Sequence, residues 1–153
     1  MFALQRTTGS DPRLPPLIAE LDADLRSRYG ATQALYAPLN HVKDDTAFVI
    51  AIDSDVASGA ALACGGFRPY DASAVELKRM FVAPAARRHG IAKALIAELE
   101  AWAREQGFTA AILETGTAQT EAIALYQRCG YTPIPAFPPY VGMPVSVCMR
   151  KAL

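Results

Sequence analysis

The sequence is poor in the residues from which metal sites and disulfide frameworks are built. Its 153 residues include only three cysteines and two histidines. Cys64, Cys129 and Cys148 are odd in number and far apart, so neither a disulfide framework nor a zinc site is indicated. His41 and His89 cannot form a metal site alone, and neither has a sequence context that ties it to a cysteine nucleophile. We therefore expect no metal, and cysteines that are small buried hydrophobes in a reducing cytoplasm.

Net charge and long apolar runs are also absent. Fifteen Lys and Arg residues balance fifteen Asp and Glu residues, so a nucleic-acid-binding surface is not expected. No run approaches the roughly 18 apolar residues of a membrane span, and the first residues do not resemble a secretion signal. Nucleotide-binding glycine motifs, the zinc-protease motif and the nucleophile-elbow motif are all missing. We expect a single domain over residues 1–153, because 52% hydrophobic residues can supply one core.

The most informative stretch runs from Val75 to Gln106. Residues 75–82 are mostly β-branched, aromatic or long, which predicts a strand. Pro84 ends this run because proline has no N–H to donate to a sheet ladder. After Gly90, apolar residues recur every three or four positions, which predicts an amphipathic helix of about four turns. The stretch therefore reads as strand, tight loop and helix.

The loop between this strand and helix carries an unusual charge. A helix start favours a polar cap and acidic residues, because its N–H groups are unpaired and its dipole end is positive. Here the chain places Arg87, Arg88, His89 and Lys93, and no Asp or Glu lies between residues 77 and 97. An uncapped helix start, a glycine and flanking guanidinium groups together indicate a phosphate-binding loop. The alternative is a solvated basic loop.

Two segments carry a resemblance to a known family. Residues 87–92, RRHGIA, resemble the Arg/Gln-x-x-Gly-x-Gly/Ala signature of the GCN5-related N-acetyltransferase (GNAT) superfamily, whose members bind the pyrophosphate of acetyl-coenzyme A (acetyl-CoA) with this loop. Residues 119–131 resemble the superfamily pattern Asn-x-x-Ala-x-x-Leu-Tyr-x-x-x-Gly-Phe, with Gln119 in place of Asn and Tyr131 in place of Phe. The resemblance implies an α/β fold: a mixed, largely antiparallel twisted sheet of six or seven strands with helices on both faces.

The resemblance also implies a function, namely transfer of an acetyl group from acetyl-CoA to a primary amine by direct attack in a ternary complex. A bulge in the predicted strand would free a backbone N–H, at Phe81 or Val82, to polarise the thioester carbonyl. The residues that it implies for acetyl-CoA binding are Met80, Phe81, Val82, Arg87, Arg88, His89, Gly90, Ile91, Ala92, Lys93 and Gln119.

Two proton transfers accompany this reaction. The acceptor amine, with a pKa of about 10, must lose a proton, and the departing thiolate, with a thiol pKa of about 8.5, should gain one. The resemblance assigns Tyr126 as the general acid near the sulfur. It places Glu76, eleven residues before Arg87, where histone-type members carry a catalytic glutamate. A carboxylate partly withdrawn from water can accept a proton, so Glu76 is the predicted base and Glu114 is the alternative.

Strand alternation predicts which way these side chains point. It places Glu76, Lys78 and Met80 on one face of the strand, away from the long helix. Arg79 then falls on the helix-covered face, where a charge needs an explanation. Gly65-Gly66, in the preceding strand, marks either a bulge, a close backbone approach or a packing need.

The remaining elements follow from periodicity and turn residues. We predict strands over 2–7, 47–52, 57–68, 109–115 and 145–151, helices over 14–29, 31–40 and 119–128, and an irregular proline-rich loop over 133–144.

The acceptor is the least determined part of the prediction. Tyr29, Tyr36, His41, Phe137 and Tyr140 are candidate pocket walls. Aromatic walls beside two carboxylates suit a cationic small-molecule amine with an apolar body. An amino acid would fit if Arg79 or Arg68 turned inward.

Other functions stay open at this point. The acceptor could be a protein lysine or N-terminus, or the domain could be an acyl-CoA sensor without turnover. A structural protein that uses its proline-rich loop as an interface is a third reading, and a homodimer stays open. Neither nucleic acid nor membrane is expected as a partner.

Overall fold

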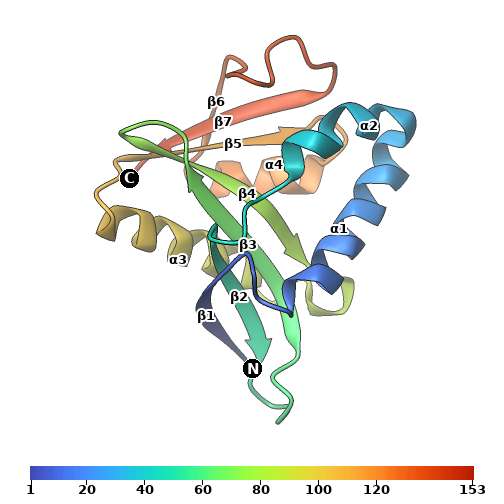
Figure 1. Ribbon diagram of the computed structural model, residues 1–153, viewed down its shortest axis with the longest axis vertical. Helices are drawn as coiled ribbons and strands as arrows, with labels where there is room; N and C mark the ends of the chain where they lie inside the picture. The colour runs from blue at the N-terminus through green and yellow to red at the C-terminus, as the bar shows by residue number, and fades with distance from the viewer.

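Seven strands form one mixed sheet in the computed structural model, which describes residues 1–153. The strand order is β1-β2-β3-β4-β5-β7-β6, and only the β4–β5 pair is parallel (Figure 1). The predicted sheet of six or seven largely antiparallel strands is therefore confirmed. The strands are β1 (Phe2–Thr8), β2 (Ala47–Asp53), β3 (Ala61–Pro69), β4 (Ala74–Val82), β5 (Ala110–Gly116), β6 (Thr132–Ile134) and β7 (Ser146–Ala152).

The helices also follow the prediction closely. The region from Ala31 to Asn40, predicted as one short helix, is divided into α2 between two 3₁₀ turns, and Pro38 lies in the second turn. The α-helices are α1 (Leu14–Tyr29), α2 (Gln33–Tyr36), α3 (Ile91–Glu105) and α4 (Thr120–Arg128), and the 3₁₀ turns are η1 (Gly30–Thr32), η2 (Ala37–Asn40) and η3 (Pro84–Ala86). None of the helices has the length and apolar character needed to cross a bilayer.

Two strand predictions were wrong in detail. β3 begins at Ala61 rather than Ala57, because a polar turn joins it to β2 and Asp53 N donates to Ala60 O at 2.9 Å. The proline-rich segment, predicted as irregular, begins with the short edge strand β6, which pairs with β7. An edge strand tolerates Pro133 because only one side of the strand has to supply ladder hydrogen bonds.

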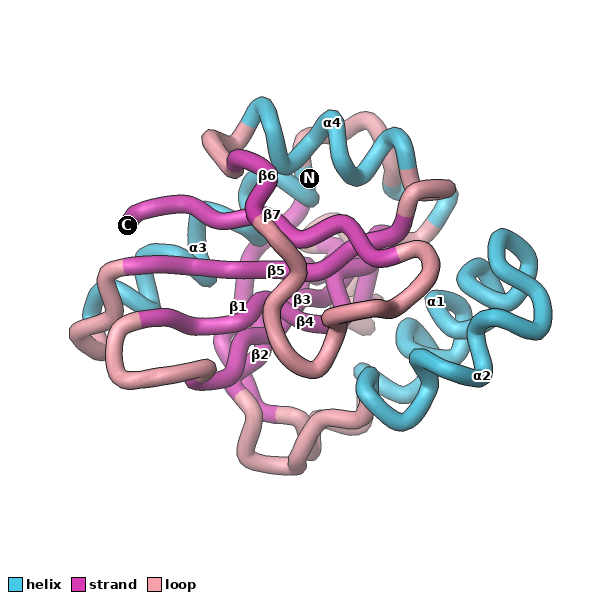
Figure 2. The backbone as a smooth tube through the Cα atoms, turned by 90° about the horizontal axis from the view of Figure 1, so that it is seen from above, coloured by secondary structure: helices cyan, strands magenta, loops and turns pink.

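Apolar residues divide the helices between the two faces of the sheet (Figure 2). The predicted stripe of α3, which includes the fully buried Leu95 and Leu99, packs on one face, and Tyr126 of α4 belongs to the same core. Leu14, Leu17 and Leu21 of α1 pack on the other face. Burying one large apolar side chain stabilises the fold by about 1.5–3 kcal/mol, so these stripes fix the position of both layers.

The sheet opens between β4 and β5. The two strands pair only from Ala74 to Glu76 and from Ala110 to Ile112. Beyond these residues no β4–β5 pairing exists, and Figure 1 shows the two arrows diverging. The C-terminal half of each strand therefore borders a gap in the sheet.

A bulge in β4 changes the predicted side-chain pattern. The β3–β4 register shifts between Cys64 and Gly66, and Arg79 opposite them has a φ of +57°. The extra residue reverses the alternation, so Met80 packs against the α3 core, whereas Arg79 faces α1. The prediction that Met80 shares a face with Glu76 is therefore wrong. A Cβ on Gly65 would lie 2.2 Å from Met80 Sδ, which explains the glycine as a close approach opposite the bulge.

Candidate active site

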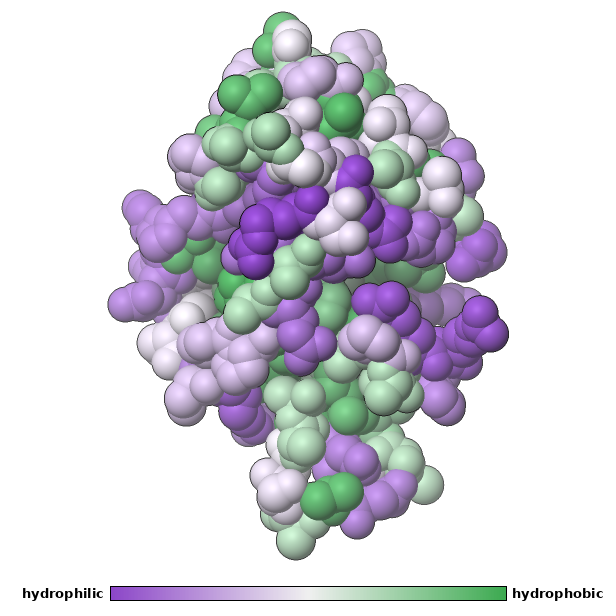
Figure 3. Space-filling view, turned by 90° about the vertical axis from the view of Figure 1, so that its right-hand side faces the viewer, coloured by the Kyte–Doolittle hydropathy of each residue, from purple (hydrophilic) through white to green (hydrophobic).

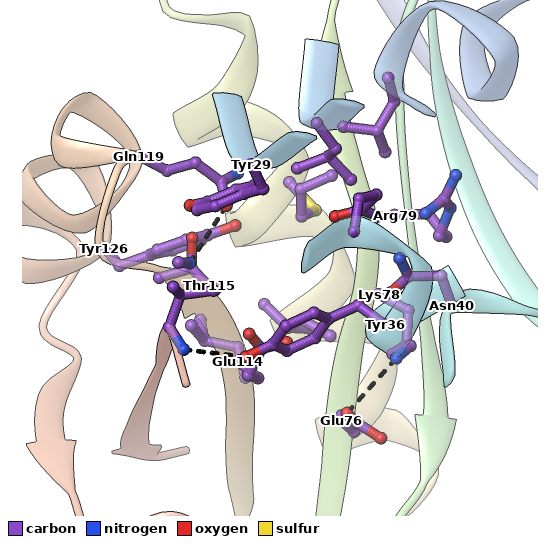
Figure 4. A pocket seen from close by; sticks show the side chains of 18 residues that line it. Tyr29, Tyr36, Asn40, Glu76, Lys78, Arg79, Glu114, Thr115, Gln119 and Tyr126 are labelled. Carbon is purple, nitrogen blue, oxygen red and sulfur yellow. Dashed lines mark hydrogen bonds and ion pairs between the residues drawn. The ribbon is translucent and has the colours of Figure 1, made fainter. Parts of the chain in front are cut away.

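A cavity of about 90 Å³ lies where β4 and β5 separate. Of the predicted site residues, those that line it are Tyr29, Tyr36, Glu76, Met80, Glu114, Gln119 and Tyr126. Figure 4 shows Tyr29, Gln119 and Tyr126 on one side of the cavity, and Lys78, Arg79 and Asn40 on the other. His41 lies at a different cavity, described below. Phe137 and Tyr140 pack in a cluster behind the wall rather than in it.

Glu76 is held by three neighbouring side chains. Its side chain is 2% exposed, and it faces away from α3, as predicted. Arg68 Nε donates to Oε1 at 3.1 Å, the Tyr140 hydroxyl donates to Oε2 at 3.1 Å, and Lys78 Nζ lies 3.6 Å from Oε2. Both carboxylate oxygens are therefore engaged within the protein.

Lys78 is a cavity residue that the sequence analysis did not select. Its ammonium donates to Leu39 O at 3.0 Å and to the Tyr140 hydroxyl at 2.8 Å. Burial lowers the pKa of Lys78, and the neighbouring Glu76 carboxylate opposes this shift. Lys78 thus joins β4 to η2 and to the proline-rich segment. The sequence signal that could have identified Lys78 is its position two residues after Glu76, on the same face of the predicted strand.

Glu114 differs from Glu76 in having no ion-pair partner. It lines the cavity from β5, on the same face of the sheet as Ile112. Burial raises the pKa of Glu114 to about 7, and the opposing effect of Lys78 is smaller. A carboxyl group with this pKa is divided between its protonated and deprotonated forms near neutral pH, which suits a general base.

Tyr126 reaches the cavity from α4. Its ring lies edge-on to Tyr131 with centroids 5.9 Å apart, and its hydroxyl makes no hydrogen bond with another residue. Burial raises the pKa of Tyr126, so the hydroxyl stays protonated at neutral pH and can donate. The neighbouring Tyr131 hydroxyl is buried and also lacks a hydrogen-bond partner.

The basic loop before α3 has the features expected of an anion site. The helix begins without a side-chain cap and without an acidic residue in its first turn. Gly90 has a φ of +77°, and a Cβ there would have no atom within 4 Å, so the backbone is open to an approaching ligand. These two observations fit the pyrophosphate of acetyl-CoA at the N–H groups of the helix start.

The side chains of this loop have different surroundings. Arg87 Nε donates to Val82 O at 3.0 Å and its guanidinium lies 5.8 Å from the Phe81 ring, so Arg87 folds back on β4. His89 Nδ1 lies 3.3 Å from Ala86 O. Arg88, with a φ of +68°, forms no ion pair within the chain and is exposed. Lys93 is likewise exposed, whereas Ala92 is half-buried.

Several predicted acetyl-CoA residues could act only through their backbone. The side chains of Phe81 and Ile91 are buried in the two cores, and Val82 packs against the α3 core.

Gln119 lies at the start of α4, where its Oε1 accepts from the Tyr29 hydroxyl and from Gly116 N, each at 3.1 Å. Its amide nitrogen donates no hydrogen bond within the chain.

The cysteines and the candidate metal ligands are dispersed through the fold. No three His, Cys, Asp or Glu side chains converge as a metal site requires. All three cysteines are free, and burial raises the pKa of Cys64 to about 12, which keeps it as an unreactive thiol.

Comparisons with known proteins show the family of the chain. A profile of the Acetyltransferase (GNAT) family matches residues 14–131. IAA acetyltransferase from Azospirillum brasilense is 37% identical over 139 residues, which span 90% of this chain and 88% of that protein. A Klebsiella pneumoniae protein, provisionally called an acyl-CoA N-acyltransferase, superposes with a TM-score of 0.82 at 32% identity. The superposition covers 100% of this chain and 98% of that one.

A third comparison concerns the fold alone. A GNAT family acetyltransferase from Elizabethkingia anophelis, solved with acetyl-CoA bound, has a TM-score of 0.69 at 15% identity, over 99% of this chain and 98% of that one. The open sheet with its uncapped basic loop is the architecture of an acyl-transferring enzyme. The chain belongs to the GNAT acetyltransferase family. It is an acetyl-CoA-dependent N-acetyltransferase, as the resemblance implied.

Proposed function

We propose that this protein acetylates the primary amine of a small molecule in the cavity between β4 and β5, by direct attack on acetyl-CoA in a ternary complex. The observation that carries the proposal is that Glu114 and Tyr126 line one cavity, where the first can accept a proton and the second can donate one. Glu114 has a pKa of about 7 and can accept a proton, whereas burial raises the pKa of Tyr126 and keeps its proton available.

The proposed reaction returns both groups to their starting protonation states. Glu114 takes a proton from the acceptor ammonium, and the neutral nitrogen attacks the thioester carbonyl carbon. The carbon–sulfur bond then breaks, the thiolate receives the Tyr126 proton, and the second proton of the reacting nitrogen passes to the Tyr126 phenolate, so that the amide, the thiol and protonated Tyr126 remain. Glu114 releases its proton to solvent. Glu76 orders the wall through Arg68, Lys78 and Tyr140. The choice of Glu76 as base stays the alternative, since its carboxylate lines the same cavity.

The bulged strand offers a donor for the developing oxyanion. Ala83 N donates to Leu62 O of β3 at 2.9 Å. Because successive N–H groups of a strand point to opposite sides, the Val82 N–H points away from β3 and toward the gap left by β5. Val82 is therefore favoured over Phe81 as the backbone group that polarises the thioester.

We place the pyrophosphate of acetyl-CoA at the basic loop before α3. The helix-start N–H groups at Ile91, Ala92 and Lys93 would hold the pyrophosphate beside Gly90, and Arg88 would add a charge-assisted contact. Arg87 would keep the loop in place through its bond to Val82 O.

A small acceptor is favoured over a protein lysine because α1, α2 and the proline-rich segment all pack over this face of the sheet. The relative from Azospirillum brasilense, named IAA acetyltransferase, also supports a small substrate. The three free cysteines are compatible with the reducing cytoplasm expected from the sequence.

The test is acetyl transfer by the purified protein. Thiol release from acetyl-CoA would be followed with polyamines, amino acids, aromatic amines, aminoglycosides and peptides, and mass spectrometry would locate the added acetyl group. We expect turnover with small amines. Turnover on peptides alone would refute the small-molecule acceptor. Binding of acetyl-CoA without turnover on any acceptor would favour the sensor.

A further inference from the structure

A second, larger cavity adjoins the active-site cavity. It has a volume of about 520 Å³ and lies between α1 and the η2 region. Ile18, Asp22 and Arg26, which lie four residues apart on one face of α1, form one of its walls. Figure 3 shows the side of the molecule that carries α1 and α2, with strongly hydrophilic residues across its middle. Three residues line both cavities, namely Gln33, Asn40 and Arg79.

Arg79 is the residue on which the two cavities meet. Its side chain is only 5% exposed, and one terminal nitrogen donates to Asp22 Oδ1 at 2.5 Å. Its Nε and second terminal nitrogen donate to no residue of the chain. A guanidinium has five N–H donors, and neither of these two nitrogens is buried without a partner, so both are accessible from the cavities. Since Arg79 borders both cavities, a bound molecule can accept hydrogen bonds from these nitrogens in place of water.

The strained backbone of Arg79 also supports a contact between its side chain and a bound molecule. Its φ of +57° is costly for a residue with a long side chain, by roughly 1–3 kcal/mol. The bulge that imposes this angle turns the guanidinium away from the α3 core and toward α1. An apolar side chain would pack on α1 without needing Asp22, so packing alone does not account for an arginine here.

The charges around the second cavity select a class of ligand. Arg26 and Arg79 line it, and Asp22, which pairs with Arg79, is its only acidic residue. Lys78 adds a buried ammonium on the active-site side. An anionic group is therefore favoured near Arg79, and an amine is favoured near Glu114. A guanidinium fork matches a carboxylate in a bidentate arrangement.

We propose that the acceptor is an amine that also carries a carboxylate, that Arg79 binds this carboxylate, and that the second cavity holds the body of the acceptor. This inference rests on the proposed function, because it takes the reacting amine to lie in the cavity between β4 and β5. It selects the amino-acid alternative of the sequence analysis over a purely cationic amine. Arg79 is then a specificity-determining residue that touches the substrate.

The experiment compares acceptors that differ only in the carboxylate. Glycine, β-alanine and γ-aminobutyrate would be assayed against methylamine, ethylamine and propylamine, and phenylalanine against phenylalaninamide and phenethylamine. In wild-type protein we expect a kcat/KM preference of at least about tenfold for the carboxylate-bearing member of one series. Arg79→Gln should remove this preference by raising KM for the carboxylates. Arg104→Gln, an exposed arginine at the end of α3, is the matched control and should retain it.

Each other result overturns one proposal and not both. Acetylation of the plain amines as fast as the carboxylates, or equal losses for both in Arg79→Gln, would refute the carboxylate subsite and leave the proposed function standing. If nothing in the panel is acetylated, calorimetric titration of phenylalanine and phenethylamine into the protein saturated with coenzyme A decides the subsite. Binding of phenylalanine that Arg79→Gln abolishes would then support it, and no carboxylate-dependent binding would refute it.

Discussion

Glu76 and Glu114 line the same cavity from neighbouring strands, yet only Glu76 is paired with cationic side chains. Arg68 and Lys78 approach the Glu76 carboxylate at 3.1 and 3.6 Å. Glu114 has no such neighbour at ion-pair distance, and burial raises its pKa to about 7. The two carboxylates are therefore suited to different tasks, Glu76 to holding the wall and Glu114 to exchanging a proton.

This difference predicts the pH dependence of the reaction. A base acts only when deprotonated, so kcat should rise as the pH rises through about 7, the pKa of Glu114. Glu114→Gln should remove this rising limb. Glu76→Gln, the matched control, should lower activity but keep the midpoint of the limb. Stopped-time thiol assays across pH would measure both. Loss of the limb in Glu76→Gln alone would return the base role to Glu76.

The general-acid role of Tyr126 can be tested with its neighbour Tyr131 as the control. Tyr126→Phe should lower kcat by about 100-fold. Affinity for coenzyme A should change little, because the hydroxyl makes no hydrogen bond within the protein. Tyr131→Phe removes a hydroxyl that is buried without a partner, so turnover and thermal stability should be preserved. Equal loss of kcat in the two variants would argue against an acid role for Tyr126.

Gly90 allows a test of the anion site that separates strain from ligand contact. Gly90 and Gly107 have φ values of +77° and +90°, and a Cβ at either would meet no atom within 4 Å. Asn tolerates the left-handed conformation better than other residues with side chains. Gly90→Asn should weaken coenzyme A binding at least about tenfold, because the new side chain occupies the approach to the helix N–H groups. Gly107→Asn should bind normally in the same calorimetric titration. Normal binding by Gly90→Asn would refute the proposed loop.

Tyr140 should matter for stability more than its single hydroxyl suggests. That hydroxyl donates to Glu76 and accepts from Lys78, so Tyr140→Phe leaves two buried charged groups short of a partner. We expect a loss of about 1–3 kcal/mol in the free energy of unfolding, measured with urea. The control is Tyr70→Phe, which removes a half-exposed hydroxyl that donates to Pro138 O at 3.2 Å. It should cost less than about 0.5 kcal/mol. Similar losses in both variants would contradict the network.

Local sequence signals predicted the framework of the site but not its interior. The α3 stripe and the bare helix start after Gly90 depend on neighbouring residues, so periodicity and charge predicted both. The orientation of Arg79 depends on a bulge whose position no local pattern specifies, so the side chains from Arg79 onward point to the opposite face from the one that strand alternation predicts. The contacts of Lys78 with Leu39 and Tyr140 join segments 39 and 62 residues apart, which only the docked fold brings together.

The short β4–β5 ladder also bears on the order of folding. Short turns join β2, β3 and β4, which pair in sequence order, whereas β4 and β5 pair over only three residue pairs and across a crossover that contains α3. β1 pairs with β2 across the longer segment that contains α1 and α2. Contacts that close short loops form rapidly, and contacts across a long crossover form slowly. We therefore expect β2, β3 and β4 to assemble early, and β1 and the group β5, β7 and β6 to dock later. Glu76 and Glu114 stand on opposite sides of that boundary, so the catalytic groups would meet only in the last step of folding.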